Sequence, residues 1–285
     1  IELTRNYGFA KGNNLGTHDV SSKYIAFLNS DVHVIENWLD PIIKFLEENQ
    51  EYGVAMPKVV SFENEKYFEY AGASGGYTDI FGYPFCRGRI FDSIEEDKGQ
   101  YDSVESISWA SGAAFVIRRD LYEKSGGFDE DFFAHHEEID LCWLLRNAGH
   151  KIAVIPSSKI LHLGGGTLDY EDTRKIHLNF RNNLFSIFKN EHWFRLIFVL
   201  PGRLLLDGVA GLKFLLEGKF TSILAVLKAH LLFYISIPRL IVKRFKNRKF
   251  VKTWKRGPVI RDGIMNSSIV FKYFIAGKKT FRDLK

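Results

Sequence analysis

A short polar motif in this sequence has the composition of a site that holds a metal ion on a diphosphate. Asn29-Ser30-Asp31 directly follows the apolar residues 24–28, which are typical of a buried strand. In an α/β protein, ligands bind beyond the carboxyl ends of the strands, where this motif would stand. Mg²⁺ typically takes one or two protein carboxylates and fills its other positions with phosphate oxygens and water. Asp31 is therefore a candidate metal ligand, and capping of a helix that begins near Ile35 or Asn37 is the alternative.

A dense group of ionisable side chains occupies positions 135–140, which read His-His-Glu-Glu-Ile-Asp. They lie at the start of a predicted helix, where capping and the helix dipole favour carboxylates, so a structural role is one explanation. The acids also repel one another, which raises at least one pKa and suits a general base that takes a proton from an alcohol. On this helix Glu137 and Asp140 share a face, whereas Glu138 points elsewhere.

His162 ends another apolar segment, residues 159–161, and would also stand at the carboxyl edge of the sheet. Gly164-Gly165-Gly166-Thr167 comes next, a run whose backbone N–H groups could approach a phosphate closely. A lone histidine is more often structural than a ligand. Its position between a strand and a glycine run keeps metal ligation open as the second role of His162.

Two further segments carry side chains suited to a ligand. Trp109-Ala110-Ser111-Gly112 begins a predicted strand, and its indole ring could stack on a sugar or be buried in the core. Positions 6–14 form a polar, glycine-rich segment after a first strand predicted at 1–3, and we interpret the segment as a ligand-binding loop.

The elements that must position these side chains alternate between strands and helices. Apolar runs predict strands at 24–28, 53–60, 107–117, 151–155 and 159–163. Helical periodicity and capping signals predict helices at 38–49, 120–125 and 137–148. This alternation predicts an α/β fold with a mixed, mainly parallel sheet flanked by helices.

The charge distribution divides the chain into two regions. Residues 1–192 carry 19 basic and 30 acidic side chains, whereas residues 193–285 carry 20 basic and 4 acidic ones. We therefore expect a catalytic domain at 1–190 and a basic, amphipathic helical region at 191–285. The two cysteines cannot form a disulfide framework and are expected to be reduced thiols of a cytosolic protein.

The basic region favours an anionic membrane surface as its partner. Its longest apolar stretch, residues 220–237, is interrupted by Lys228 and His230, whereas a membrane span needs about 20 mostly apolar residues. Basic helices that interleave Leu, Ile and Phe suit the surface of a bilayer better than nucleic acid, so we expect no nucleic-acid partner. A helical bundle packed on the catalytic domain is the alternative.

Taken together, these segments resemble the inverting family 2 glycosyltransferases of the GT-A fold, especially the rhamnosyltransferase-like branch of bacterial polysaccharide assembly. The matching segments follow the order of the family and extend from position 1 to about 190. They lie at 6–16, 27–31, 109–113, 127–133, 137–143, 162–167 and 181–182.

The resemblance implies a role for each candidate residue. Glu138 falls where the family has its catalytic base, usually an Asp, and Asp31 and His162 match metal ligands for Mg²⁺ or Mn²⁺. Asn29 replaces the first acid of the family's metal motif. The implied acceptor-binding residues are Trp109, Glu137 and Asp140. The implied donor-binding residues are Asn6, Gly8, Lys11, Asn13, Asn29, Gly165, Thr167 and Arg181.

The implied reaction is a single displacement on a UDP- or dTDP-sugar by a hydroxyl of a glycan or lipid-linked acceptor, at the inner face of the cell membrane. The family begins with a strand, a helix and a second strand that have no counterpart here, so we expect residues 1–285 alone to be unstable or inactive. Two alternatives stay open. One is a metal-dependent nucleotidyltransferase, and the other is a degenerate transferase that acts as a membrane-bound scaffold.

Overall fold

The structure, a computed structural model, describes residues 2–69, 71–164 and 173–284. Its central sheet has the strand order β1–β9–β3–β10–β2, and a short strand, β8 (Glu105–Ser106), also pairs with β10. The strands of this order are β1 (Tyr24–Leu28), β2 (Val32–Val34), β3 (Tyr52–Ser61), β9 (Ala114–Arg118) and β10 (Lys151–His162). They share apolar, often β-branched residues, which is why the sequence predicted most of them.

The sheet is mixed, as predicted, but most of its strand pairs are antiparallel rather than parallel. Among the described strands only the pair β3 and β10 is hydrogen-bonded in parallel, whereas β9 pairs antiparallel with both β1 and β3, and β2 pairs antiparallel with β10. The reason lies between β3 and β9, where the chain forms a second small sheet instead of the crossover helix that a parallel connection needs.

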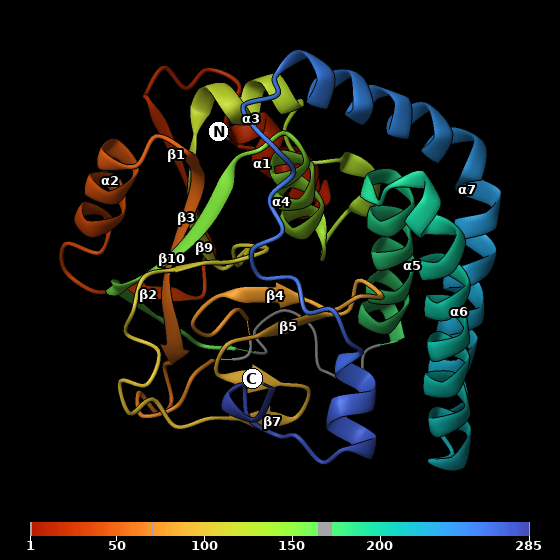
Figure 1. The fold of residues 1–285 in the computed structure, drawn as a ribbon. Coiled ribbons are helices and arrows are strands. Elements are labelled where there is room, and N and C mark those ends of the chain that lie inside the picture. Colours follow the sequence, from red (N-terminus) through yellow and green to blue (C-terminus); the bar gives the residue numbers. More distant parts are fainter. Residues whose placement is uncertain (1, 70, 165–172, 285) are drawn as a thin grey trace.

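Helices cover both faces of the central sheet (Figure 1). On one face lies α2 (Leu39–Glu48), whose Ile42 and Leu46 pack on Ala55 of β3 and Ala153 of β10. On the other face lie α3 (Arg119–Ser125) and α4 (Glu137–Asn147), with Leu121 and Leu145 in the main core. The sheet is therefore buried on both sides, as in other α/β proteins.

The small sheet corrects the strand predicted at 107–117. It contains β4 (Gly76–Thr78), β5 (Pro84–Cys86), β6 (Arg89–Ile90) and β7 (Ser93–Ile94), all antiparallel. Trp109 forms an isolated bridge with Gly76, so the chain at 107–113 contacts the small sheet before it enters β9. Only the last part of the predicted strand belongs to the central sheet.

The N-terminal part of the chain also differs from the prediction. Glu2 and Leu3 lie outside the strands, and the expected loop at 6–14 is largely a helix, α1 (Gly8–Gly16). Asn6 starts this helix because its side-chain oxygen accepts a hydrogen bond from the Gly8 N–H. The Ala10 N–H donates to the Phe133 carbonyl, so a tertiary contact outweighs the low helix propensity of the glycines.

Three long helices follow the sheet: α5 (Thr173–Asn190), α6 (Trp193–Leu216) and α7 (Phe220–Thr253). The α6 and α7 helices form a hairpin beside α5 (Figure 1), and Phe185, Leu196 and Phe233 from the three helices share one apolar cluster. By length and composition, α7 is the one helix of the described residues that could cross a membrane, although 28% of its most apolar window is buried in the protein.

Candidate active site

The carboxyl ends of β1 and β10 bring Asp31 and His162 together. The Leu163 N–H donates to the Asp31 carbonyl, because β2 turns back beside the end of β10 directly after the motif at 29–31. The His162 Nε2 atom lies 3.3 Å from Asp31 Oδ1. Two residues that are 131 positions apart in the sequence thus share one edge of the sheet, as predicted.

A second carboxylate, that of Glu69, holds the other side of the His162 ring. Glu69 is buried, and its Oε2 atom lies 3.1 Å from His162 Nδ1 and accepts a hydrogen bond from the Ala71 N–H. The chain turns after β3 and pairs Phe68 with Val60, which points Glu69 back toward the end of β10. Sequence reasoning missed Glu69, because it lies in an irregular segment without a motif.

The pair Asp31 and His162 fits one half of a metal site. Both ring nitrogens of His162 are buried without a well-aligned hydrogen bond, and Nε2 lies beside the Asp31 carboxylate, so an ion bound there would displace the proton that these carboxylates favour on the ring. Burial lowers the pKa of His162, but Glu69 and then Asp31 outweigh it, and the net pKa is raised. No cluster of three or more metal-ligating side chains occurs among the described residues. A diphosphate and water would have to complete the shell.

Glu138 lies at the start of α4 and has the properties of a base. Burial raises the pKa of its half-buried carboxyl to about 7, while the N–H groups of Glu138 and Ile139 act in the opposite direction. A Cβ atom on Gly112 would lie 3.5 Å from the Glu138 carboxyl carbon, an ordinary van der Waals distance, so the chain before β9 lies directly beside this carboxyl. The carboxyl can gain or lose a proton near neutral pH, as a general base requires.

A continuous path connects Glu138 to the candidate metal ligands. Gly112, which faces Glu138, is followed by Ala113, whose carbonyl accepts a hydrogen bond of 2.9 Å from the Asn29 N–H. Asn29 is two residues before Asp31. The start of α4, the chain before β9 and the ends of β1 and β10 therefore meet at one edge of the sheet.

The two acids beside Glu138 are both buried. The pKa of Glu137 is raised well above its usual value by burial and by the neighbouring Glu138. Asp140 accepts hydrogen bonds from Lys189 at 2.7 Å and from Asn190 at 2.7 Å. Contact of Asp140 with an acceptor, which stays a prediction, would require this arrangement to open. Contact of Glu137 with an acceptor also stays a prediction and would also require an opening, because only 4% of this residue is exposed.

The Trp109 side chain is packed inside the protein rather than exposed to a ligand. Its indole N–H donates to the Tyr77 carbonyl, and its ring lies so close to Gly76 that a Cβ atom there would come within 2.2 Å of it. With 7% of its surface exposed, Trp109 offers little area to a sugar in this conformation. The core role, one of the two that the sequence left open, is the one that these contacts support.

The predicted donor-binding residues of α1 make structural contacts. Lys11 lies 3.1 Å from Glu130, and the Asn13 side chain donates to the Phe9 carbonyl. Gly8 has a φ of 79°, and a Cβ atom there would collide with Phe133, so only glycine suits this position. These contacts fix α1 beside the segment at 128–133 that leads to Glu138. Binding of a donor by this helix stays a prediction.

Arg181 of α5 holds the segment at 128–133 in place. Its guanidinium donates to the carbonyls of Asp131 and Phe132, and the adjacent Asn182 donates to the carbonyls of Phe132, Ala134 and His135. These bonds hold in place the turn from which Glu138 emerges. Of the other predicted donor-binding residues, Gly165 and Thr167 lie outside the described residues.

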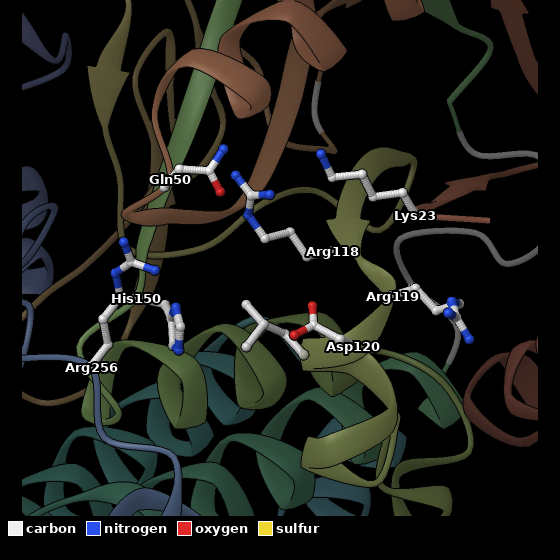
Figure 2. Close-up of a pocket in the computed structure, with 8 residues that line it drawn as sticks. Lys23, Gln50, Arg118, Arg119, Asp120, His150 and Arg256 are labelled. Atoms are coloured by element: carbon white, nitrogen blue, oxygen red, sulfur yellow. The ribbon is translucent and has the colours of Figure 1, made fainter. Parts of the chain in front are cut away.

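A hollow of about 350 Å³ lies at the opposite edge of the sheet (Figure 2). Its lining includes Lys23, just before β1, and His150, just before β10. Two of its cations are engaged: Lys23 pairs with Glu47, and Arg118 donates to the Tyr52 carbonyl. This hollow therefore lies apart from the edge where Asp31, His162 and Glu138 gather.

In the comparisons with known proteins, this chain is similar to glycosyltransferases. Residues 1–126 match the family Glycosyl transferase family 2. Rhamnosyltransferase WbbL of Escherichia coli is 26% identical over 163 residues, which are 55% of this chain and 61% of WbbL. The N-acetylglucosaminyl-diphospho-decaprenol L-rhamnosyltransferase of Mycobacterium tuberculosis is 31% identical over 88 residues, which are 31% of this chain and 28% of that protein. The chain thus spans about three fifths of the length of WbbL.

A solved structure is also similar. The crystal structure of GalNAc-T7 with UDP, GalNAc and Mn²⁺ matches 66% of this chain and 35% of its own, with a TM-score of 0.48 and 14% identity. The resemblance to the family rests on the sequence match over residues 1–126, not on this likeness. With the mixed sheet and its flanking helices, that match confirms the predicted GT-A α/β fold and the family resemblance.

Proposed function

We propose that this protein transfers a sugar from a nucleotide-diphosphate donor to a hydroxyl of a glycan or lipid-linked acceptor, a proposal supported by the match of residues 1–126 to glycosyl transferase family 2. The observation that carries the proposal is the convergence of Asp31, His162 and Glu138 at one edge of the sheet. A metal-binding pair and a base of near-neutral pKa are the groups that such a transfer requires.

The proposed reaction is a single displacement. Glu138 takes the proton of the acceptor hydroxyl, whose oxygen forms a bond to the anomeric carbon while the bond from that carbon to the diphosphate oxygen breaks. Because the oxygen enters opposite the leaving group, the anomeric configuration inverts. Asp31 and His162 would hold Mg²⁺ or Mn²⁺, which supplies positive charge for the departing nucleoside diphosphate.

The relatives suggest the first substrates to test. Two of them are named rhamnosyltransferases, and the acceptor named for one is an N-acetylglucosaminyl-diphospho-decaprenol. We therefore propose a UDP- or dTDP-sugar as the donor, with rhamnose as the first candidate, and bacterial polysaccharide assembly as the process. A lipid-linked acceptor would place the enzyme in the cytoplasm on the inner face of the cell membrane.

A donor screen with the full-length protein tests the proposal. Incubation with Mn²⁺, an acceptor and each nucleotide sugar is expected to release a nucleoside diphosphate. Release of pyrophosphate would instead indicate a nucleotidyltransferase, and a folded protein without turnover on any donor would indicate a scaffold.

Glu138→Gln is the variant that tests the base. It keeps the side-chain size but cannot accept the proton, so turnover is expected to fall on the order of 10²- to 10⁴-fold. Glu48→Gln, at the exposed last position of α2 and near the opposite edge of the sheet, is the matched control and is expected to leave turnover unchanged. Full activity of the Glu138→Gln protein would remove Glu138 from this role.

A further inference from the structure

The outer side of the α6–α7 hairpin is lined by large apolar side chains that no other part of the described chain covers. Phe198 of α6 is 76% exposed and Val242 of α7 is 68% exposed. The exposed apolar residues recur at steps of three, four or seven positions, so they form one stripe along each helix. The stripe residues are Phe194, Phe198, Leu205, Val209, Leu212 and Leu216 on α6, and Phe220, Leu224, Leu227, Leu231, Ile235, Val242 and Phe245 on α7.

The opposite sides of the two helices are well packed. Leu196 and Val199 of α6 join Phe233 and Leu240 of α7 in the apolar cluster that includes Phe188 of α5. The stripes therefore lie on the sides turned away from this cluster. Monomeric soluble proteins rarely expose continuous apolar patches larger than a few hundred Å², so these stripes indicate a surface that is covered in use.

The charged residues beside the two stripes indicate the kind of surface that covers them. The sequence of α7 contains no acidic residue. At the end of its stripe, the next positions at the same spacing are Lys249 and Lys252, and both are exposed. Lys228, Arg239 and Lys246 flank the stripe, one residue C-terminal to Leu227, Pro238 and Phe245. Glu217, in the turn between the two helices, pairs with Lys213 and Lys219, and Arg239 also pairs with Asp131. Apolar stripes bordered mainly by cations match the boundary between acyl chains and anionic headgroups.

Polar contacts on the inner side of the hairpin hold it against the protein. Lys243 of α7 pairs with Asp129 and Asp131 of the segment that leads to Glu138. Within the hairpin, the buried Asp207 of α6 pairs with Arg203 at 2.7 Å and lies 3.1 Å from His230 of α7. A helix that crossed a bilayer would have to give up the contacts of Lys243 and bury its charge in hydrocarbon, which is costly.

We propose that the outer face of the α6–α7 hairpin docks on an anionic lipid bilayer, with both stripes in the boundary between headgroups and acyl chains and with α7 lying along the surface rather than across the membrane. This inference deepens the proposed function and rests on it in one respect: a lipid-linked acceptor gives the protein a reason to dock on a membrane. The lysine-rich end of α7 then faces the headgroups.

Sedimentation with lipid vesicles tests this surface. The full-length protein is expected to pellet with vesicles of phosphatidylcholine and phosphatidylglycerol, and more weakly with phosphatidylcholine alone. Lys249→Gln with Lys252→Gln is expected to weaken the first binding on the order of tenfold, since each basic residue near an anionic surface contributes several-fold. A stripe variant with four exposed apolar residues changed is expected to lose binding to both. It combines Phe198→Gln, Leu205→Gln, Leu231→Gln and Val242→Gln.

A matched control carries the same kind of change at exposed apolar positions elsewhere, and it is expected to bind as the parent protein does. It combines Phe62→Gln, Ile94→Gln, Val104→Gln and Val259→Gln. The proposal would be overturned if a folded stripe variant bound the vesicles as well as the parent protein does. It would also be overturned if the parent protein formed a dimer in solution and the stripe variant were monomeric. Resistance of the bound protein to alkaline carbonate extraction would overturn the surface orientation. Because sedimentation needs no donor and no turnover, its outcome is independent of the transferase assay.

Discussion

Glu137 and Glu138 are neighbours on one helix end, yet their surroundings give them different chemistry. Glu137 is buried, and burial and the neighbouring Glu138 raise its pKa well above the usual value. Glu138 is half-buried, its pKa lies at about 7, and its carboxyl lies beside Gly112. Of these two neighbours, Glu138 is the one with a pKa near neutral, as the proposed base requires, so the environment and not the residue type distinguishes them.

The pH dependence of turnover follows from this pKa. The base acts in its ionised form, and the ionised fraction of Glu138 grows as the pH rises through about 7. We therefore expect kcat/KM to rise with pH, with a midpoint near that value, and to fall toward acid pH. A pH titration of initial rates at saturating Mn²⁺ measures this. A profile that is flat through neutral pH would contradict the assignment.

Glu69 is expected to act on the metal ion through His162. Its carboxylate fixes the orientation of the ring and the nitrogen that carries the proton, which leaves Nε2 directed at Asp31. Glu69→Gln is expected to weaken Mn²⁺ binding about 10- to 100-fold, measured by calorimetry with a nucleoside diphosphate present. The exposed Glu48→Gln serves as the control. Unaltered Mn²⁺ affinity in the Glu69→Gln protein would assign Glu69 to folding alone.

At the scale of elements, sequence patterns located most helices and strands but not how they associate. The strands around Phe27 and Ala55 and the helix at Glu137 were predicted close to their observed bounds, because burial imposes apolar periodicity on the sequence. The antiparallel direction of β9 and the position of Glu69 depend on contacts between distant segments, which leave no local pattern. The same limit explains α1, whose helix is stabilised by the segment at 128–133.

Buried ion pairs show how these elements are held together. Lys189 of α5 reaches both Asp129 and Asp140, at 2.6 and 2.7 Å, and joins α5 to α4 and to the turn before it. Lys189→Met would leave both carboxylates without this partner. We expect the free energy of unfolding to fall by about 3–5 kcal/mol, measured by urea denaturation. Lys98→Met, which removes an exposed pair with Glu96, is expected to cost at most ~1 kcal/mol. Equal losses would contradict this structural role.

At the scale of the whole molecule, the end of the chain returns to the small sheet. Phe281 packs against Tyr77, Phe85 and Tyr101, and the Met265 N–H donates to the Thr78 carbonyl. Charge asymmetry suggested a boundary near residue 190, and a division at that point stays a prediction. The contacts of the last residues show that part of the basic region packs on the catalytic side of the molecule (Figure 1).

Gly263 makes this return possible. Its φ is 72°, and a Cβ atom there would lie 2.3 Å from the Ser108 backbone nitrogen. Gly263→Ala is therefore expected to loosen the C-terminal segment and to speed tryptic cleavage after Arg256 and Arg261 on the order of tenfold, the equivalent of ~1.4 kcal/mol. Gly257→Ala is the control, because open space surrounds its Cβ position. Similar cleavage rates in the two variants would contradict this packing.

The account as a whole depends on a sugar leaving its nucleotide by direct attack of an acceptor hydroxyl at the edge where Asp31, His162 and Glu138 meet. Proton NMR of the anomeric signals during turnover by the full-length protein with Mn²⁺ follows this event directly. We predict that the donor signal decays only when acceptor is present and that the product carries the opposite anomeric configuration. A product with the configuration of the donor would contradict the single displacement and the role of Glu138 in it.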